Sequence, residues 1–177
     1  MPVLTNELAE TVEFSPFIIR SSSDLEAPIL VALFDYWDRL RGHRFAPGRK
    51  EIRPADIPTL LPHLLIFELL DADHRCKVRL AGSLISRYFD PGLTGTILDD
   101  RNDNLAERRN LAAMRRVARE RVPLGCAWDV ENLPDLTFRS SEVIWLPLSS
   151  DGVTVDQIIS SFWLTPKQRS VPVGFNL

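Results

Sequence analysis

The stretch FRSSEVIWLPLSSDGVTVDQIISSFW, residues 138–163, decides the fold class of this chain. From Val143 to Leu148 the apolar residues divide between two faces, with the two-residue period of a β-strand. The turn Ser149–Gly152 ends in the Asp-Gly pair that favours a tight hairpin connection, and a further strand is predicted from Val153 to Trp163. Strands joined by such a short turn pair antiparallel.

Three more strands are predicted upstream of this hairpin. An apolar run at 64–70, an alternating run at 76–81 and a short segment at 124–130 have the length and pattern of strands. A short helix at 84–89 and a long helix at 104–121 separate the second of these strands from the third. Because single strands do not alternate with helices, a doubly wound parallel sheet is excluded. We expect an α+β domain with a five-stranded antiparallel sheet and helices on one face.

An amphipathic helix is predicted before the first of these strands. Ser23 and Glu26 have the spacing of a capping box, and Gly42 suits the C-terminal end of the helix. Apolar residues at helical spacing lie between them, at Ile29, Leu33, Tyr36, Trp37 and Leu40. The chain then divides into a lead-in at 1–24, a domain at 25–163 that includes this extra N-terminal helix, and a tail at 164–177.

Composition limits the class of protein. The formal net charge is −3, whereas a nucleic-acid-binding domain is usually strongly basic, so we expect no nucleic-acid partner. No apolar run approaches the length of a membrane span or a signal peptide, which predicts no membrane association. Two cysteines, Cys76 and Cys126, are too few for a disulfide framework and are expected to be reduced. Together these features predict a cytoplasmic protein.

Residue types that carry chemistry occur without the spacing that catalysis or metal binding requires. His43, His63 and His74 do not pair at metal-ligand spacing, and two carboxylate pairs lie in turn-like sequence. Nucleophile-elbow, zinc-protease and phosphate-loop motifs do not occur. We expect no metal site, no catalytic residues and no enzyme activity. The alternative is a small α+β enzyme whose groups meet only in the folded chain.

Four groups of motifs, in order along the chain, carry a family resemblance. They are WDRLRG at 37–42 with PGR at 47–49 and RPADIP at 53–58; VRLAG at 78–82; LTG at 93–95; and LPLS at 146–149 with Asp151-Gly152. In this order they resemble the bacterial PAS_5 family, over about residues 25–163. The resemblance implies a sensory or regulatory domain, and we expect its output to pass through another chain rather than through a fused kinase, cyclase or DNA-binding domain.

The resemblance also implies a ligand pocket between the inner face of the sheet and the short helices. Aromatic residues on the predicted strands and beside the short helix would line it: Tyr88, Phe89, Trp128, Trp145 and Phe162. Such a pocket would bind a small apolar ligand. The alternative is that the same residues fill the core of a ligand-free interaction or dimerisation module.

Cofactor-binding PAS domains carry signatures that this sequence lacks. No histidine occurs in the long helix at 104–121, where haem PAS domains have one, and Cys76 and Cys126 fall on or beside strands rather than on a flavin-binding helix. We therefore expect no cofactor.

Two surfaces are candidates for partner binding. Tyr36 and Trp37 on the N-terminal helix would suit a homodimer interface. Arg115, Arg116 and Arg119 on the long helix would suit an acidic or phosphate-bearing signalling partner, the alternative being an ordinary solvated face.

Overall fold

The computed structural model describes residues 13–70, 75–88, 92–99, 101, 104–129 and 138–166, and only the backbone of residues 88, 138 and 139. Within these residues one sheet has seven strands in the order β1-β5-β6-β7-β2-β3-β4. The strands are β1 (Phe17–Ile18), β2 (Leu64–Leu69), β3 (Cys76–Ala81), β4 (Ile97–Leu98), β5 (Leu124–Asp129), β6 (Phe138–Leu148) and β7 (Gln157–Pro166).

All neighbouring strands pair antiparallel, as predicted, but the predicted number of five is wrong. The two additional strands, β1 and β4, are two residues long and lie at the edges of the sheet. A two-residue strand has no alternation that a sequence pattern could reveal. Strand β1 lies in the segment predicted as a lead-in.

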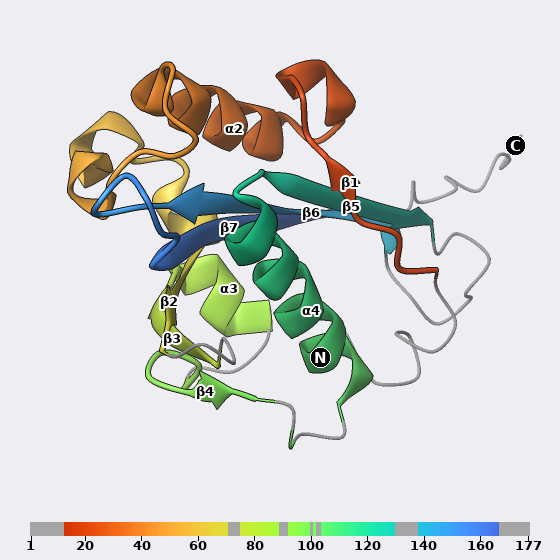
Figure 1. The fold of residues 1–177 in the computed structure, drawn as a ribbon. Helices are drawn as coiled ribbons and strands as arrows, with labels where there is room; N and C mark the ends of the chain where they lie inside the picture. The colour runs from red at the N-terminus through yellow and green to blue at the C-terminus, as the bar shows by residue number, and fades with distance from the viewer. Residues whose placement is uncertain are drawn as a thin grey trace, which may run out of the picture.

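Helices cover both faces of the sheet (Figure 1). Helix α2 (Pro28–Arg41) lies on one face, while α3 (Ser83–Tyr88) and α4 (Leu105–Glu120) lie on the other. Alternation along β6 divides the core accordingly: Ile144, Leu146 and Leu148 pack with α2, whereas Val143 and Trp145 pack with α4. Four short 3-10 helices complete the described elements: η1 (Ser22–Asp24), η2 (Arg49–Glu51), η3 (Pro54–Asp56) and η4 (Leu61–His63).

Helix α2 is anchored to the sheet at both ends. It begins at Pro28 without a side-chain cap of its own, and the buried carboxylate of Glu142 accepts the Ala27 backbone N–H at 2.8 Å. Negative charge is favourable at this end of a helix. Near the other end, the Trp37 indole N–H donates to the carbonyl oxygen of Pro147 at 2.8 Å, and Gly42 ends the helix with a φ of 56°.

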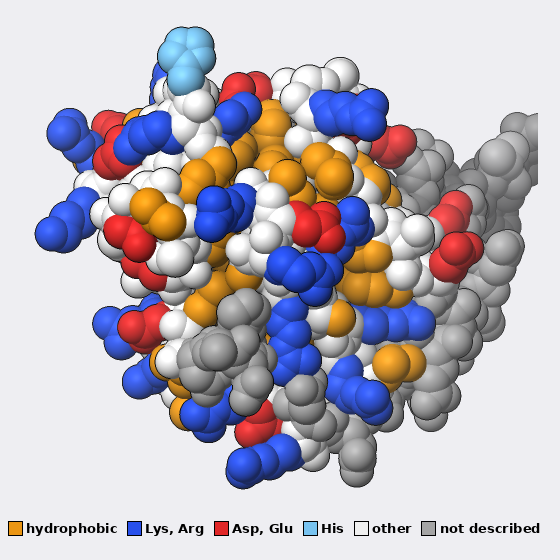
Figure 2. Space-filling view, viewed as in Figure 1, with side chains coloured by type: hydrophobic (Ala, Val, Ile, Leu, Met, Phe, Trp, Pro, Cys, Tyr) orange, Lys and Arg blue, Asp and Glu red, His pale blue; other side chains and the backbone are white. Residues whose placement is uncertain are grey.

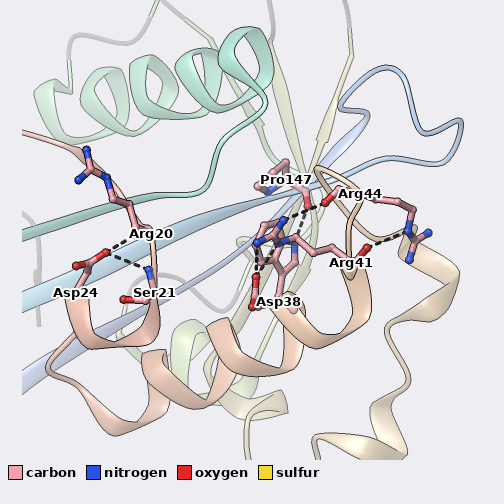
Figure 3. A network of polar contacts seen from close by, with 8 residues as sticks. Arg20, Ser21, Asp24, Asp38, Arg41, Arg44 and Pro147 are labelled. Carbon is pink, nitrogen blue, oxygen red and sulfur yellow. Dashed lines mark hydrogen bonds and ion pairs between the residues drawn. The ribbon is translucent and has the colours of Figure 1, made fainter.

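The aromatic stripe of α2 is turned inward. Tyr36 and Trp37, predicted at a dimer surface, are instead 4% and 0% exposed, because the stripe packs on the chain's own sheet. Polar residues hold the outer side of the helix end: in Figure 3, Arg41 donates to the Asp38 carboxylate at 2.7 Å and to the Arg44 carbonyl oxygen at 3.1 Å.

Helix α4 covers the inner face of the sheet. The Asn104 side chain accepts the Glu107 backbone N–H at 3.1 Å, which caps the first turn. Four of its residues are buried against the sheet: Leu111, Ala113, Met114 and Val117. Among the residues described, no helix has both the length and the apolar character that crossing a membrane would require.

Candidate ligand pocket between helix α3 and strand β7

A pocket opens where strand β7 outruns its neighbour β2. The ladder between these strands ends with the pair Leu64–Ser161, whereas β7 continues along β6 to Pro166. Helices η4 and α3 lie beside this extension and enclose a cavity of about 230 Å³. We call it the α3–β7 pocket; its lining residues are His63, Leu84, Ile85, Phe162, Trp163, Leu164 and Pro166.

Gly82 allows the two walls of the pocket to meet. Its backbone N–H donates to the carbonyl oxygen of Leu64 at 2.8 Å, just before α3 begins. A Cβ at this position would lie 2.4 Å from the carbonyl oxygens of both Leu61 and Pro62. Only glycine therefore lets the η4 backbone approach the start of α3 this closely.

The walls of the pocket are mainly apolar, with one imidazole. Ile85 and Phe162 are buried, at 1% and 8% exposed. The half-buried ring of His63 lies 6.1 Å from the Trp163 ring, centre to centre. Burial lowers the pKa of His63, so its imidazole is neutral near pH 7. The pocket thus offers apolar surface, the indole N–H donor of Trp163 and one neutral imidazole.

The inner face of the sheet beside α4 is filled by side chains. Trp145 is 1% exposed, and its indole N–H donates to the Asn110 side-chain oxygen at 2.7 Å. Phe14 packs edge-on against the same indole, and Met114 of α4 is fully buried in the same cluster. Trp145, predicted to contact a ligand, therefore belongs to the packed core here.

A larger and more polar cleft lies beyond the start of α2. Its volume is about 590 Å³, and its lining includes Trp128 together with the carboxylates of Asp24, Glu26, Asp129 and Glu142. Such a carboxylate-rich lining favours water over an apolar ligand, which would displace water from charged groups. Trp128 thus lies at a different cavity from Phe162.

A family model described as a PAS domain, PAS_5, matches residues 25–162. The chain belongs to the PAS_5 family. This confirms the resemblance carried by the sequence motifs and identifies a domain of the sensory or regulatory class. No curated protein and no solved structure matches the chain.

The ligand residues predicted for this PAS_5 domain do not converge on one site. Phe162 lines the α3–β7 pocket, whereas Trp145 lies in the core and Trp128 at the polar cleft. The Tyr88 side chain and Phe89 lie outside the described residues. In the described part of the PAS_5 domain, no group of three or more His, Cys, Asp or Glu side chains could hold a metal ion.

Three of the lining residues, His63, Leu84 and Ile85, are not predicted from the sequence, whereas Trp163 is one of the aromatic residues on the last predicted strand. The sequence shows no metal-ligand spacing at His63, which favours an ordinary surface or loop histidine. Its position directly before the buried strand β2 was the available signal, because a residue at a strand's entrance lies at the rim of the core.

The arginine surface of the PAS_5 domain lies along α4, where Figure 2 shows many Lys and Arg side chains. Arg119 is exposed, with 69% of its side chain accessible. Arg116 instead holds the chain together, since it donates to the Pro16 carbonyl oxygen at 2.9 Å and to Glu120 at 3.0 Å. Arg115 is half-buried. A docking role for these residues stays a prediction.

Proposed function

We propose that this PAS_5 domain is a sensory or regulatory module that binds one small apolar molecule in the α3–β7 pocket, and that it does not act as an enzyme. The observation that carries the proposal is the apolar cavity itself, enclosed by η4, α3 and β7. An occupant would contact all three segments at once. Binding would therefore fix η4 and α3 relative to the sheet, which gives the ligand a structural effect.

The size of the pocket restricts the ligand. Pockets for drug-sized molecules usually measure about 300–1,000 Å³, and an apolar cavity of about 150 Å³ holds benzene. A cavity of about 230 Å³ suits one ring with a few substituent atoms. A flavin or a haem, each with several fused or linked rings, is too large for it.

A thermal-unfolding experiment with toluene tests the proposal. Toluene at ten times its Kd should stabilise the folded domain by about 1.4 kcal/mol, which raises the Tm by roughly 3–6 °C. Leu84→Trp fills the pocket and should abolish this rise. Leu70→Trp, at a surface leucine that does not line the pocket, is the matched control and should keep it. A wild-type Tm that toluene leaves unchanged contradicts the proposal.

A second candidate function is docking of an acidic signalling protein on α4. The observation in its favour is charge: α4 has the sequence LAERRNLAAMRRVARE, with five arginines against two glutamates. Arg108→Glu combined with Arg119→Glu is the better test, because both side chains are exposed and Arg116 is needed internally. Unchanged recovery of partner proteins, relative to the control Arg39→Glu, would count against this surface.

Homodimerisation of the domain is a further proposal in which the domain binds a protein rather than a small molecule. With Tyr36 and Trp37 buried, a dimer would have to use other residues. Sedimentation equilibrium of the purified chain measures the oligomeric state directly, and a monomer at all concentrations would rule the dimer out.

A further inference from the structure

Among the described residues that line the α3–β7 pocket, His63 has the one side chain that can both donate and accept a hydrogen bond, since the Trp163 indole can only donate. The ring nitrogens of His63 make no hydrogen bond with any residue that the structure describes, although the ring is half-buried beside Trp163. A half-buried imidazole without a protein partner can hydrogen-bond water or a ligand, and the pocket is where a ligand would meet it.

The absence of charge in the described pocket lining restricts which polar group a ligand can carry. The lining residues that the structure describes include no Lys, Arg, Asp or Glu, and desolvation lowers the pKa of His63. A neutral imidazole has one N–H donor and one nitrogen acceptor. A ligand carboxylate or ammonium would be desolvated there without an opposite charge, which is costly. A hydroxyl both donates and accepts, as the imidazole does, and carries no charge.

The walls select the rest of the ligand. Ile85 and Phe162 are almost fully buried, and Leu84 and Leu164 complete the apolar lining. An aromatic ring fits such walls, because ring–ring contacts with Phe162 and Trp163 add to the burial of apolar surface. The volume of about 230 Å³ limits the ligand to one ring with small substituents.

We infer that the α3–β7 pocket is a site for a small neutral phenol, whose hydroxyl hydrogen-bonds the His63 ring while its aromatic ring lies among the apolar walls. The inference rests on the proposed function and adds the ligand class and the residue that determines specificity. One hydrogen bond of ordinary net strength makes phenol bind about threefold to tenfold more tightly than toluene, which has the same shape and no hydroxyl.

Calorimetric titration with phenol and with toluene tests the inference on three proteins. The wild type should prefer phenol by about threefold to tenfold. His63→Phe keeps an aromatic ring beside Trp163 and removes the nitrogens, so it should bind both compounds equally. His43→Phe, at an exposed histidine away from the pocket, is the matched control and should keep the wild-type preference.

A readout on the imidazole itself separates recognition from a structural role of His63. Phenol should shift the ring nitrogen resonances of His63 in ¹⁵N NMR spectra, and toluene should shift them much less. Equal affinity of the wild type for both compounds, or a phenol preference that survives His63→Phe, overturns the inference while toluene binding still supports the proposed function. Binding of neither compound by the wild type overturns both.

Discussion

Replacing Gly82 by alanine should destabilise the domain, because the new Cβ would clash with two backbone carbonyl groups of η4. These groups lie about twenty residues earlier in the sequence but close to Gly82 in space. An ideal Cβ would lie 2.4 Å from the carbonyl oxygens of Leu61 and Pro62, whereas ordinary contacts begin at 3.4 Å. The η4 backbone must therefore retreat by 3.4 − 2.4 Å, or about 1 Å, because neither atom belongs to a flexible side chain. This movement also strains the hydrogen bond from Gly82 N–H to Leu64.

The magnitude follows from three contributions. Overpacking of this kind costs about 1–3 kcal/mol, and the weakened hydrogen bond adds about 1 kcal/mol. Alanine restricts the unfolded chain more than glycine does, which offsets about 0.4–1 kcal/mol. The steric cost wins, so the free energy of unfolding should fall by about 1–3 kcal/mol and the Tm by roughly 2–12 °C.

Urea unfolding followed by tryptophan fluorescence measures this change, with Gly48→Ala as the matched control. A Cβ on Gly48 would meet the movable Glu51 carboxylate at 3.3 Å and the Ser149 carbonyl oxygen at 3.5 Å, and its φ of −78° suits alanine. The control should therefore be neutral or slightly stabilised. Equal unfolding free energies for Gly82→Ala and Gly48→Ala would refute the reasoning about close approach at η4.

Three further predictions concern polar groups. Glu142→Ala leaves the backbone N–H groups before α2 without their acceptor and should cost about 1–3 kcal/mol in urea unfolding; a wild-type midpoint would contradict this. Trp37→Phe removes the donor to the buried Pro147 carbonyl and should cost a similar amount; no loss would show that this bond is dispensable. Arg44 lowers the pKa of Glu51 from 4.5 to about 2, so its stabilisation is present above pH 4.5 and is lost as the pH falls towards 2. Glu51→Gln should therefore lose less stability than the wild type between pH 7 and pH 3, by under about 1 kcal/mol because the pair is exposed; parallel pH profiles would refute this.

The hairpin that decides the fold could be predicted because its signals are local. Alternation along β6 and the Asp-Gly turn sufficed for antiparallel pairing, which the structure confirms. The start of β7 could not be predicted from them. The Asp151 carboxylate accepts the backbone N–H groups of Val153 and Thr154, both at 2.8 Å, and this holds the loop open so that the strand begins at Gln157 rather than at Val153.

The candidate site was less predictable, because its residues meet only through the fold. Alternation separates the two faces of a strand, but it cannot tell whether Trp145 or Phe162 borders a cavity. Asn110, on a helix that precedes β6, accepts the Trp145 N–H and fixes that side chain in the core. His63 reaches the pocket because Gly82 lets η4 approach α3. The spacing of residues in the sequence does not predict this contact between a glycine and two distant carbonyl groups.

The position of α2 follows from the apolar residues on both faces of β6, which the sequence-based prediction of a sheet with helices on one face did not take into account. A sheet covered on one face has polar residues on the other, whereas β6 is apolar on both faces from Val143 to Leu148. Both faces therefore require cover, and the aromatic stripe of α2 is the partner that the second face needs. Because α2 occupies this face and is tied to it by Glu142 and Trp37, a signalling partner cannot dock on the sheet without displacing the helix. A partner would therefore have to use the outer side of α2, where Asp35 and Arg39 are exposed, or the opposite layer, where Arg108 and Arg119 of α4 are exposed.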